Sequence, residues 1–243
     1  MRLPRHDTQL SLPAEPPAAG ISADEGLLQR PAWRLWTASS AAVVVGIGLH
    51  HRLDAIVDRA RCERDGLQIL KRSAGGGALL LDEHMLCGAV AVPTARLATQ
   101  DVTESYRWLA DLLLEALELP SARRVDVVEA RDDIQTLKAA PDAVSQALLT
   151  TCYGALSPHE IVVDLKKLVG LAQVRRREAA LFQFGILLRD QSPLADYLCV
   201  PDEQTREDVR QALAQRTVGL RAVTDRPASA VAAAIAGAMP SVL

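Results

Sequence analysis

The chain has 243 residues, of which 49% are hydrophobic and 23% are charged, and its formal net charge is −3. This length and composition predict a globular protein that can bury a sizeable core, and the net charge gives no general electrostatic basis for binding nucleic acid. Because aromatic residues make up only 3% of the chain, the core must be built from aliphatic side chains.

The first twenty residues contain four prolines and no continuous apolar segment. They predict a disordered proline-rich lead over residues 1–20 rather than a secretory signal. No apolar run reaches the roughly 18–20 residues that span a bilayer. The four cysteines form no Cys-x-x-Cys pair, which excludes zinc ribbons and thioredoxin-like motifs. We therefore expect a cytoplasmic protein with reduced thiols, no metal site and no membrane partner.

Hydrophobic periodicity and turn residues predict the elements in chain order. The first half is predicted to contain a helix, two strands, a helix, two or three strands and a helix, over residues 24–29, 33–37, 42–48, 52–65, 67–72, 78–92 and 103–119. The second half is predicted to contain a strand, a helix, three strands and two helices, over residues 125–130, 143–149, 159–164, 168–174, 179–188, 206–215 and 228–236. Because hairpins join most strands, this order favours an α+β fold with a largely antiparallel mixed β-sheet flanked by helices, as one domain over residues 21–243.

Residues 71–78 read Lys-Arg-Ser-Ala-Gly-Gly-Gly-Ala between two predicted strands. The run Gly75, Gly76 and Gly77 exposes successive backbone N–H groups, which can bind an anion or let a thin ligand pass close to the backbone. Arg72, just before the glycines, adds a forked donor suited to a phosphate or a carbonyl. A flexible hairpin turn explains the segment equally well, so both interpretations stay open here.

Residues 166–173 read Lys-Lys-Leu-Val-Gly-Leu-Ala-Gln, and Arg175, Arg176 and Arg177 follow shortly after. A lysine at a strand start, beside a tight turn, can direct its ammonium at a fixed position. Burial would lower the pKa of this lysine, whereas an anionic substrate would raise it. The alternative is a solvated basic edge strand.

Cys152 follows the predicted helix over 143–149 and precedes the loop that leads to the lysine strand. Most free cysteines are small buried apolar groups, and this interpretation applies to Cys152 as well. A nearby ammonium such as that of Lys167 would lower the pKa of the thiol from about 8.5 toward neutrality, which would make Cys152 a candidate nucleophile.

Together these segments resemble the biotin/lipoate protein ligase family, which includes lipoate–protein ligases and octanoyltransferases. The resemblance is carried by residues 71–77 with Asp82, by the lysine strand over 166–173, and by Gln183-Phe184-Gly185, and it extends from about residue 20 to residue 243. It implies that family's catalytic domain, without a substantial C-terminal accessory domain. The substrate-binding residues that it implies are Arg72, Gly75, Gly76, Gly77, Asp82, Gly170 and Ala172.

The family contains two chemistries. Lipoate ligases activate the free acid with ATP and Mg²⁺ as an acyl-adenylate, whereas a cysteine-dependent octanoyltransferase branch takes the acyl group from acyl carrier protein as a thioester and needs no cofactor. Cys152 lies 15 residues before Lys167, a spacing that is similar to the cysteine-dependent branch. The resemblance therefore implies that Cys152 accepts the acyl group, and that Lys167 lowers its pKa and polarises the acyl carbonyl.

The resemblance also implies the partners. The donor is octanoyl–acyl carrier protein, or free lipoate or octanoate in the ligase alternative, and the acceptor is a lysine of a lipoyl domain or of a glycine-cleavage H-type protein. We expect a narrow apolar tunnel for the acyl chain, with walls from Leu79, Leu81, Val90 and Val92. The run Arg175, Arg176 and Arg177 is a candidate docking strip for an acidic carrier, and a solvated hairpin end is the alternative.

Several positions depart from the family pattern, at which histidine, threonine, tyrosine or serine is expected. These positions are Ala74, Leu81, Cys87, Gly88 and Phe184. They leave open a divergent paralogue that binds acyl carriers without catalysis. The presence of both Cys152 and Lys167 at the matching spacing favours an enzyme.

Overall fold

The computed structural model describes residues 12–239, and its centre is a seven-stranded sheet in the order β1-β2-β6-β10-β9-β8-β7. The strands are β1 (Ala14–Glu15), β2 (Trp33–Ala38), β6 (Met85–Pro93), β7 (Ala122–Arg124), β8 (Ile161–Val163), β9 (Lys166–Arg175) and β10 (Ala179–Leu187). All neighbouring pairs in this sheet are antiparallel except β1 and β2. The predicted α+β class with a largely antiparallel sheet is confirmed.

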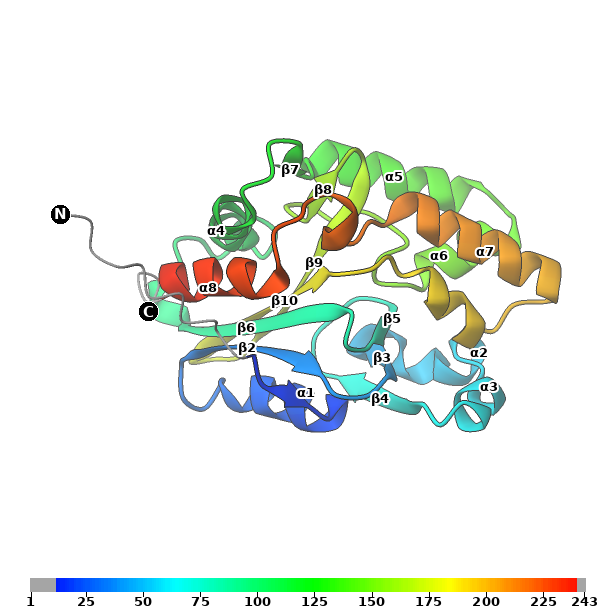
Figure 1. Ribbon diagram of the computed structural model, residues 1–243, viewed down its shortest axis with the longest axis horizontal. Helices are drawn as coiled ribbons and strands as arrows, with labels where there is room; N and C mark the ends of the chain where they lie inside the picture. Colours follow the sequence, from blue (N-terminus) through cyan, green and yellow to red (C-terminus); the bar gives the residue numbers. More distant parts are fainter. Residues whose placement is uncertain (1–11, 240–243) are drawn as a thin grey trace.

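A second, three-stranded sheet lies beside the first, in the order β4-β3-β5 (Figure 1). Its strands are β3 (Ala42–Gly46), β4 (Gln68–Arg72) and β5 (Ala78–Leu81). β3 is parallel to β4 and antiparallel to β5. The sharp turn at Asp82 separates β5 from β6, so the predicted apolar run over 78–92 is divided between the two sheets.

Helices lie on both faces of the large sheet and beside the small sheet (Figure 1). They are α1 (Pro17–Gly26), α2 (Leu53–Ile56), α3 (Arg59–Arg64), α4 (Arg107–Leu117), α5 (Val127–Ala139), α6 (Ala143–Leu149), α7 (Glu203–Arg216) and α8 (Ala228–Ala238). α4 and α8 pack together on one face of the large sheet, α1 lies on the opposite face beside β2, and α2 and α3 lie beside the small sheet. None of the helices within residues 12–239 is long and apolar enough to cross a bilayer.

The alternation of side chains along β10 divides the interior into two parts. Phe182, Phe184 and Ile186 belong to the main core with the leucines of α4 and the apolar residues of α8. Gln183 and Gly185 face the other side, toward α1 and the small sheet, and line a cavity there. One face of the sheet therefore builds the core and the other builds a binding site.

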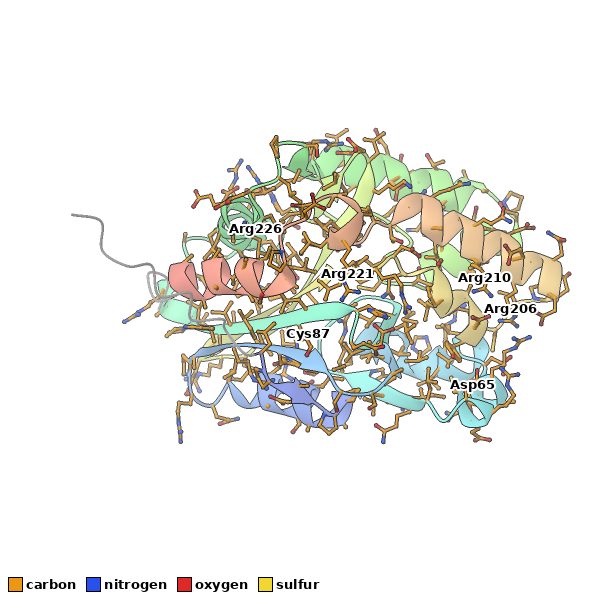
Figure 2. The ribbon with its side chains drawn as sticks, in the orientation of Figure 1. Asp65, Cys87, Arg206, Arg210, Arg221 and Arg226 are labelled. Atoms are coloured by element: carbon orange, nitrogen blue, oxygen red, sulfur yellow. The ribbon has the colours of Figure 1, made fainter. Side chains whose placement is uncertain are left out.

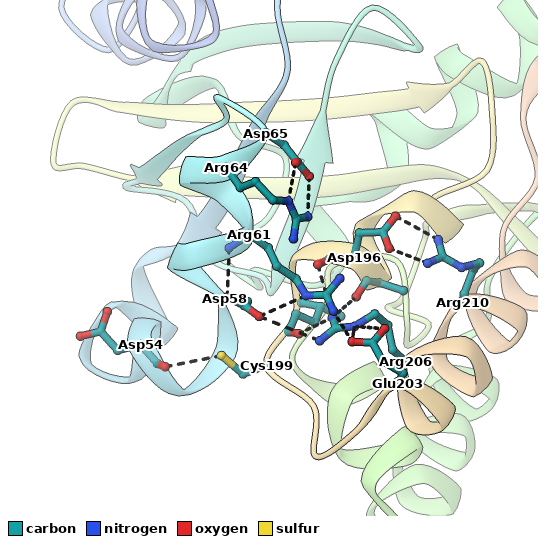
Figure 3. A network of polar contacts seen from close by, with 12 residues as sticks. Asp54, Asp58, Arg61, Arg64, Asp65, Asp196, Cys199, Glu203, Arg206 and Arg210 are labelled. Carbon is teal, nitrogen blue, oxygen red and sulfur yellow. Dashed lines mark hydrogen bonds and ion pairs between the residues drawn. The ribbon is translucent and has the colours of Figure 1, made fainter.

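Polar contacts hold the periphery of this framework. Arg226 donates to the carbonyl oxygens of Ala116 (2.6 Å) and Leu117 (3.3 Å) at the C-terminal end of α4 (Figure 2), where a cation also opposes the helix dipole. Figure 3 shows the corresponding network around α3 and α7, in which the buried Arg206 donates to the carbonyl oxygens of Ala195 (2.8 Å) and Leu198 (2.9 Å). These arginines fix loops and stand apart from the cavity.

Two sequence predictions are wrong at the level of elements. Residues 125–130 were expected as a strand, but Asp126 and Glu129 form a capping box that starts α5, and the strand is β7 just before it. Residues 1–20 were expected to be disordered, but β1 pairs with β2 and α1 begins at Pro17. Within this lead, residues 1–11 lie outside the described residues, as do residues 240–243 at the other end.

The predicted helix over 52–65 is interrupted. Val57 adopts an extended conformation and pairs with Leu198 as an isolated bridge, so α2 and α3 are separate short helices. The apolar positions of this segment do face the core, since Leu53, Ile56, Val57 and Cys62 are all buried. Tertiary pairing at Val57 breaks the helix that the period indicates.

Candidate active site

An apolar cavity lies between the large sheet, the small sheet and α1. The space that it encloses, with the solvent in its open mouth included, is about 520 Å³. The apolar end is formed by Trp36, Val44, Leu79, Leu81, Met85 and Cys87. Figure 2 labels Cys87 on β6, where it lies between β2 and β10 in the pairing register. The shape and lining suit an aliphatic chain.

The expected walls of this cavity are correct only in part. Leu79 and Leu81 line it, but Val90 and Val92 lie on the opposite face of the sheet in the main core. The reason is the period of two along β6, which places Cys87 on the cavity side and Val90 on the core side. Leu81, which occupies the position of the histidine expected from the family pattern, adds to the apolar lining.

The glycine segment approaches other backbone segments closely at two points. A Cβ at Gly46 would lie 2.2 Å from the carbonyl oxygen of Gly76, and one at Gly77 would lie 2.4 Å from that of Thr150. Gly76 has φ +98°, a conformation that favours glycine. The start of the segment is tied to α1, because Glu25 accepts hydrogen bonds from the amide (2.9 Å) and the hydroxyl (2.7 Å) of Ser73. The segment is therefore a fixed loop rather than a free hairpin turn.

This loop places Cys152 at the cavity. Ala78, at the end of the loop, donates to Thr150 O (2.8 Å) and accepts from the amide of Cys152 (2.7 Å). The half-buried thiol of Cys152 lines the cavity and lies 3.6 Å from Nη2 of Arg72, which also donates to Gly75 O (2.8 Å). Arg72 Nη2 is therefore a hydrogen-bond donor directed at the Cys152 sulfur.

The ammonium of Lys167 has a different environment from the one expected. Lys167 is fully buried, and its Nζ donates to the carbonyl oxygens of Cys152 (2.6 Å) and Ala155 (3.0 Å) and forms an ion pair with Glu160 (2.5 Å). Three protein acceptors thus occupy its three protons. Lys167 holds the backbone of the Cys152 loop, and the cation beside the thiol itself is Arg72.

Glu160 is a site residue that sequence reasoning missed. It is completely buried, and burial raises the pKa of its carboxyl group, while Lys167 opposes this rise. It also accepts from the amides of Ser157 (2.7 Å) and Leu171 (3.3 Å), which joins the Cys152 loop to β9. In the sequence, Glu160 is marked only as an acidic residue directly before the apolar run Ile161-Val162-Val163. That position does not indicate that its partner is Lys167.

Tyr153 explains two glycines of the site. Its hydroxyl donates to Gly185 O (2.8 Å), and its ring lies against the paired glycines Gly170 and Gly185, where a Cβ would approach it to 3.0 Å and 2.7 Å. Gly170 and Ala172 line the cavity as expected. Gly170 thus also makes room for the neighbour of Cys152.

Asp82 lies away from the cavity. One carboxylate oxygen accepts from the amide of His84 (2.9 Å), and the other accepts from Nη2 of Arg189 (2.8 Å). Asp82 therefore shapes the turn between β5 and β6. Both of its oxygens face the turn and Arg189, and contact of Asp82 with substrate stays a prediction.

An outer cavity adjoins the apolar one. It is lined in part by Gly75, Gly76, Tyr106 and Gln173, and it shares Leu171 and Ala172 with the apolar cavity. Burial raises the pKa of the Tyr106 hydroxyl far above its usual range. The two cavities therefore meet at Leu171 and Ala172, and Cys152 lines the apolar one.

The three consecutive arginines lie at the β9–β10 hairpin, next to this outer cavity through Gln173. Arg175 is tethered, since its guanidinium donates to Gln173 Oε1 (3.1 Å) and to the carbonyl oxygens of Gln100 (2.7 Å) and Asp101 (3.3 Å). Arg176 and Arg177 are exposed. Only these two present their charge freely to a partner.

A buried polar cluster connects α1 to the cavity wall. Asp24 accepts from Trp36 Nε1 (3.1 Å), Arg34 Nη1 (2.7 Å) and Gln183 Nε2 (3.1 Å). Burial raises the pKa of the Asp24 carboxyl, and the hydrogen bond and charge of Arg34 oppose the rise. Within residues 12–239, no group of three or more His, Cys, Asp or Glu side chains is arranged to hold a metal ion.

Comparison with known proteins agrees with this geometry. Residues 23–238 match the family model of the lipoyl protein ligase A/B catalytic domain. Octanoyltransferase LipM of Lysinibacillus sphaericus is 26% identical over 223 residues, which cover 87% of this chain and 76% of the relative. Octanoyltransferase LipM of Kyrpidia tusciae is 30% identical over 190 residues, which cover 76% and 66%.

A solved structure shares the fold. It is that of a bipartite lipoate protein ligase from an archaeal lipoylation system, that of Thermoplasma acidophilum. It superimposes with a TM-score of 0.71 at 18% sequence identity and covers 95% of this chain and 81% of its own. The predicted fold type, that of a lipoate ligase catalytic domain, is confirmed.

Proposed function

The chain belongs to the lipoyl protein ligase A/B catalytic-domain family and is a transferase; from this premise we propose that it moves an octanoyl group from acyl carrier protein to a lysine of a lipoyl carrier domain, through a thioester on Cys152. The relatives named octanoyltransferase support the octanoyl group and the lipoylation pathway. The thioester route is our inference from the site.

The observation that carries this proposal is the position of the Cys152 thiol. It lines an apolar cavity beside the Arg72 guanidinium, at a distance of 3.6 Å. Arg72 Nε is buried and has no partner within the described residues. A free donor next to a nucleophile is what a developing oxyanion on an acyl carbonyl needs. We propose that Arg72 binds this oxyanion, and that Lys167 positions the loop.

The proposed reaction has two half-reactions. In the first, the Cys152 thiolate attacks the thioester carbonyl of octanoyl–acyl carrier protein, and the carrier's thiolate leaves and takes up a proton. In the second, a neutral lysine amine of the lipoyl domain or of an H-type protein attacks the Cys152 thioester. The amine loses one proton, an amide forms, and Cys152 returns as the free thiol. Neither half-reaction requires ATP, Mg²⁺ or another cofactor.

The apolar cavity supplies binding energy for the chain. An octanoyl tail buries roughly seven methylene or methyl groups, which at about 0.8 kcal/mol each contribute about 5–6 kcal/mol. This energy holds the acyl group while the carriers exchange. A free carboxylic acid would instead need activation, which is the role of ATP in the ligase alternative.

The direct test is the intact mass of the purified protein after incubation with octanoyl–acyl carrier protein. We expect one added octanoyl group that hydroxylamine removes, and no addition to Cys152→Ala. Cys199→Ala is the matched control, because Cys199 is exposed but lies outside the cavity, and this variant should be acylated like the wild type. Full transfer by Cys152→Ala that depends on ATP and free octanoate would overturn the thioester route.

A second prediction concerns the carrier surface. Replacing Arg176 and Arg177 by Gln should slow transfer to an acidic lipoyl domain severalfold at low salt and flatten its salt dependence, because charge steering acts on encounter and is screened over about 10 Å at 0.1 M salt. Arg175 stays intact, since it tethers the segment around Gln100. The measurement is the rate of transfer as a function of ionic strength. An unchanged slope would mean that the hairpin is a solvated surface that does not contact the carrier.

A further inference from the structure

Gln183, a residue of the apolar cavity wall, holds a buried hydrogen-bond acceptor without a partner among the described residues. It lies on β10 between Ala172 of β9 and Ala89 of β6, two small neighbours in the pairing register. Gln183 lines the same cavity as the Cys152 thiol. Its Oε1 is buried and has no hydrogen-bond partner within residues 12–239. Buried polar atoms in native proteins are seldom left without a partner, so this oxygen calls for a ligand.

The orientation of the Gln183 amide is fixed by Asp24. A carboxylate can only accept hydrogen bonds, so the amide must turn its Nε2 toward Asp24 Oδ2, at 3.1 Å. Asp24 is itself held by Arg34 and Trp36 from the other side. The amide oxygen is therefore directed away from Asp24, and the cavity wall offers an acceptor at this point.

An octanoyl chain has no donor for this oxygen. The second half-reaction brings one, because an attacking lysine amine carries N–H groups. Ala172, the direct neighbour of Gln183 across β9 and β10, lines both the apolar and the outer cavity. Gln183 thus lies next to a residue that the two cavities share.

We infer that Gln183 Oε1 accepts a hydrogen bond from the attacking amine and orients it toward the acyl carbon, an inference that rests on the proposed thioester route. The nitrogen lone pair forms the new N–C bond, and the C–S electron pair leaves with the Cys152 sulfur. The nitrogen becomes positive as it attacks, which strengthens its hydrogen bond to Oε1. One amine proton is then released and the sulfur takes up one proton. Because the bond strengthens during attack, it acts on the rate.

The test separates the two half-reactions in Gln183→Met. The rate of Cys152 acylation by octanoyl–acyl carrier protein is measured by intact mass. The acylated protein is then isolated and mixed with a lipoyl domain in a single-turnover experiment. We expect acylation within about twofold of the wild type, and a transfer rate about ten- to a hundredfold lower. If Gln183→Met does not fold, Gln183→Asn is measured in the same way. Asparagine keeps the amide, but its side chain is one methylene shorter, so the amide oxygen cannot reach the position of Gln183 Oε1.

Gln191→Met is the matched control, because Gln191 is also a buried glutamine but bonds both of its polar ends to the backbone of Leu80, at 2.9 Å and 3.0 Å. It should lower thermal stability and leave the ratio of the two rates unchanged. Equal losses in both half-reactions of Gln183→Met, or no loss in transfer, would overturn the role inferred for Gln183 and leave the proposed function standing. A loss seen only in loading of 3-hydroxyoctanoyl would assign the oxygen to a substituted acyl chain instead. A wild-type protein that carries no acyl group on Cys152 would overturn the proposed function itself.

Discussion

Arg72→Met is expected to slow the acylation of Cys152 by about two to three orders of magnitude, the usual cost of removing one oxyanion donor. The change removes the guanidinium that contacts the thiol, together with the Nε that has no partner among the described residues and would meet the oxyanion. Arg72→Lys should recover little, because an ammonium has no second donor to take the place of Nε while the first stays on Gly75 O and the thiol. The measurement is the single-turnover rate of acylation by octanoyl–acyl carrier protein.

Lys71→Met is the control for this prediction. Lys71 precedes Arg72 on the same strand, is exposed, and points to the other side of β4. It should keep the wild-type rate. A loss of similar size in both variants would indicate a general basic patch, and an unchanged rate in Arg72→Met would remove Arg72 from the proposed mechanism.

Lys167→Met is expected to lower the free energy of unfolding by about 3–5 kcal/mol, because it leaves the Glu160 carboxylate buried and unpaired. The double variant Lys167→Met with Glu160→Gln should recover part of this loss, since no buried charge remains. Lys166→Met is the control, since Lys166 faces the other side of the strand and its Nζ makes a long hydrogen bond to Ala214 O, at 3.4 Å. It should change stability by less than about 0.5 kcal/mol. Denaturant unfolding of the four proteins measures these differences.

The deficit of Lys167→Met should depend on pH with a defined sign. Burial already raises the pKa of Glu160, and the variant removes the charge that opposes this rise. The folded variant then holds a proton on Glu160 above the pH at which the unfolded chain ionises, about 4.3 for a free glutamate. Its stability relative to the wild type is therefore best at acidic pH and falls as the pH rises through the raised pKa. A deficit that is constant between pH 4 and pH 8 would contradict the buried ion pair.

Lys167→Met should also reduce activity, because Lys167 Nζ holds the carbonyl oxygen of Cys152. This loss differs in kind from that of Arg72→Met. The stability and the rate should fall together in the lysine variant. Arg72 is a half-buried residue at the end of β4, and its removal should act on the rate with a smaller change in the free energy of unfolding.

Much of the frame was determined by local sequence. The apolar run of β10 and the lysine strand β9 predict two buried strands, and both are present with boundaries shifted by at most two residues. The opposite directions of Lys166 and Lys167 also follow from the period of two. The sequence further marked the glycine loop and Cys152 as candidates, and the structure brings Arg72, Gly76 and Cys152 together at the cavity.

The tertiary structure decided which groups are partners. Phe184 stands where the family pattern has histidine, and its ring fills the space above Gly88, where a Cβ would lie 2.0 Å from it. These two departures are therefore one packing unit across β6 and β10, although 96 residues separate them. The pairing of β6 with β10 is set by long-range contacts, so neither position alone indicates the other.

The same reason explains the site. Spacing along the chain placed Lys167 near Cys152, but it could not tell whether the ammonium meets the thiol or the backbone. That choice depends on Glu160, which the bulged β8–β9 pairing brings to the buried end of the lysine side chain. A buried lysine turns toward whichever carboxylate and carbonyl oxygens remove the cost of burying its charge. Residue type and period determine which side chains face inward, and only the packed fold determines what each of them meets there.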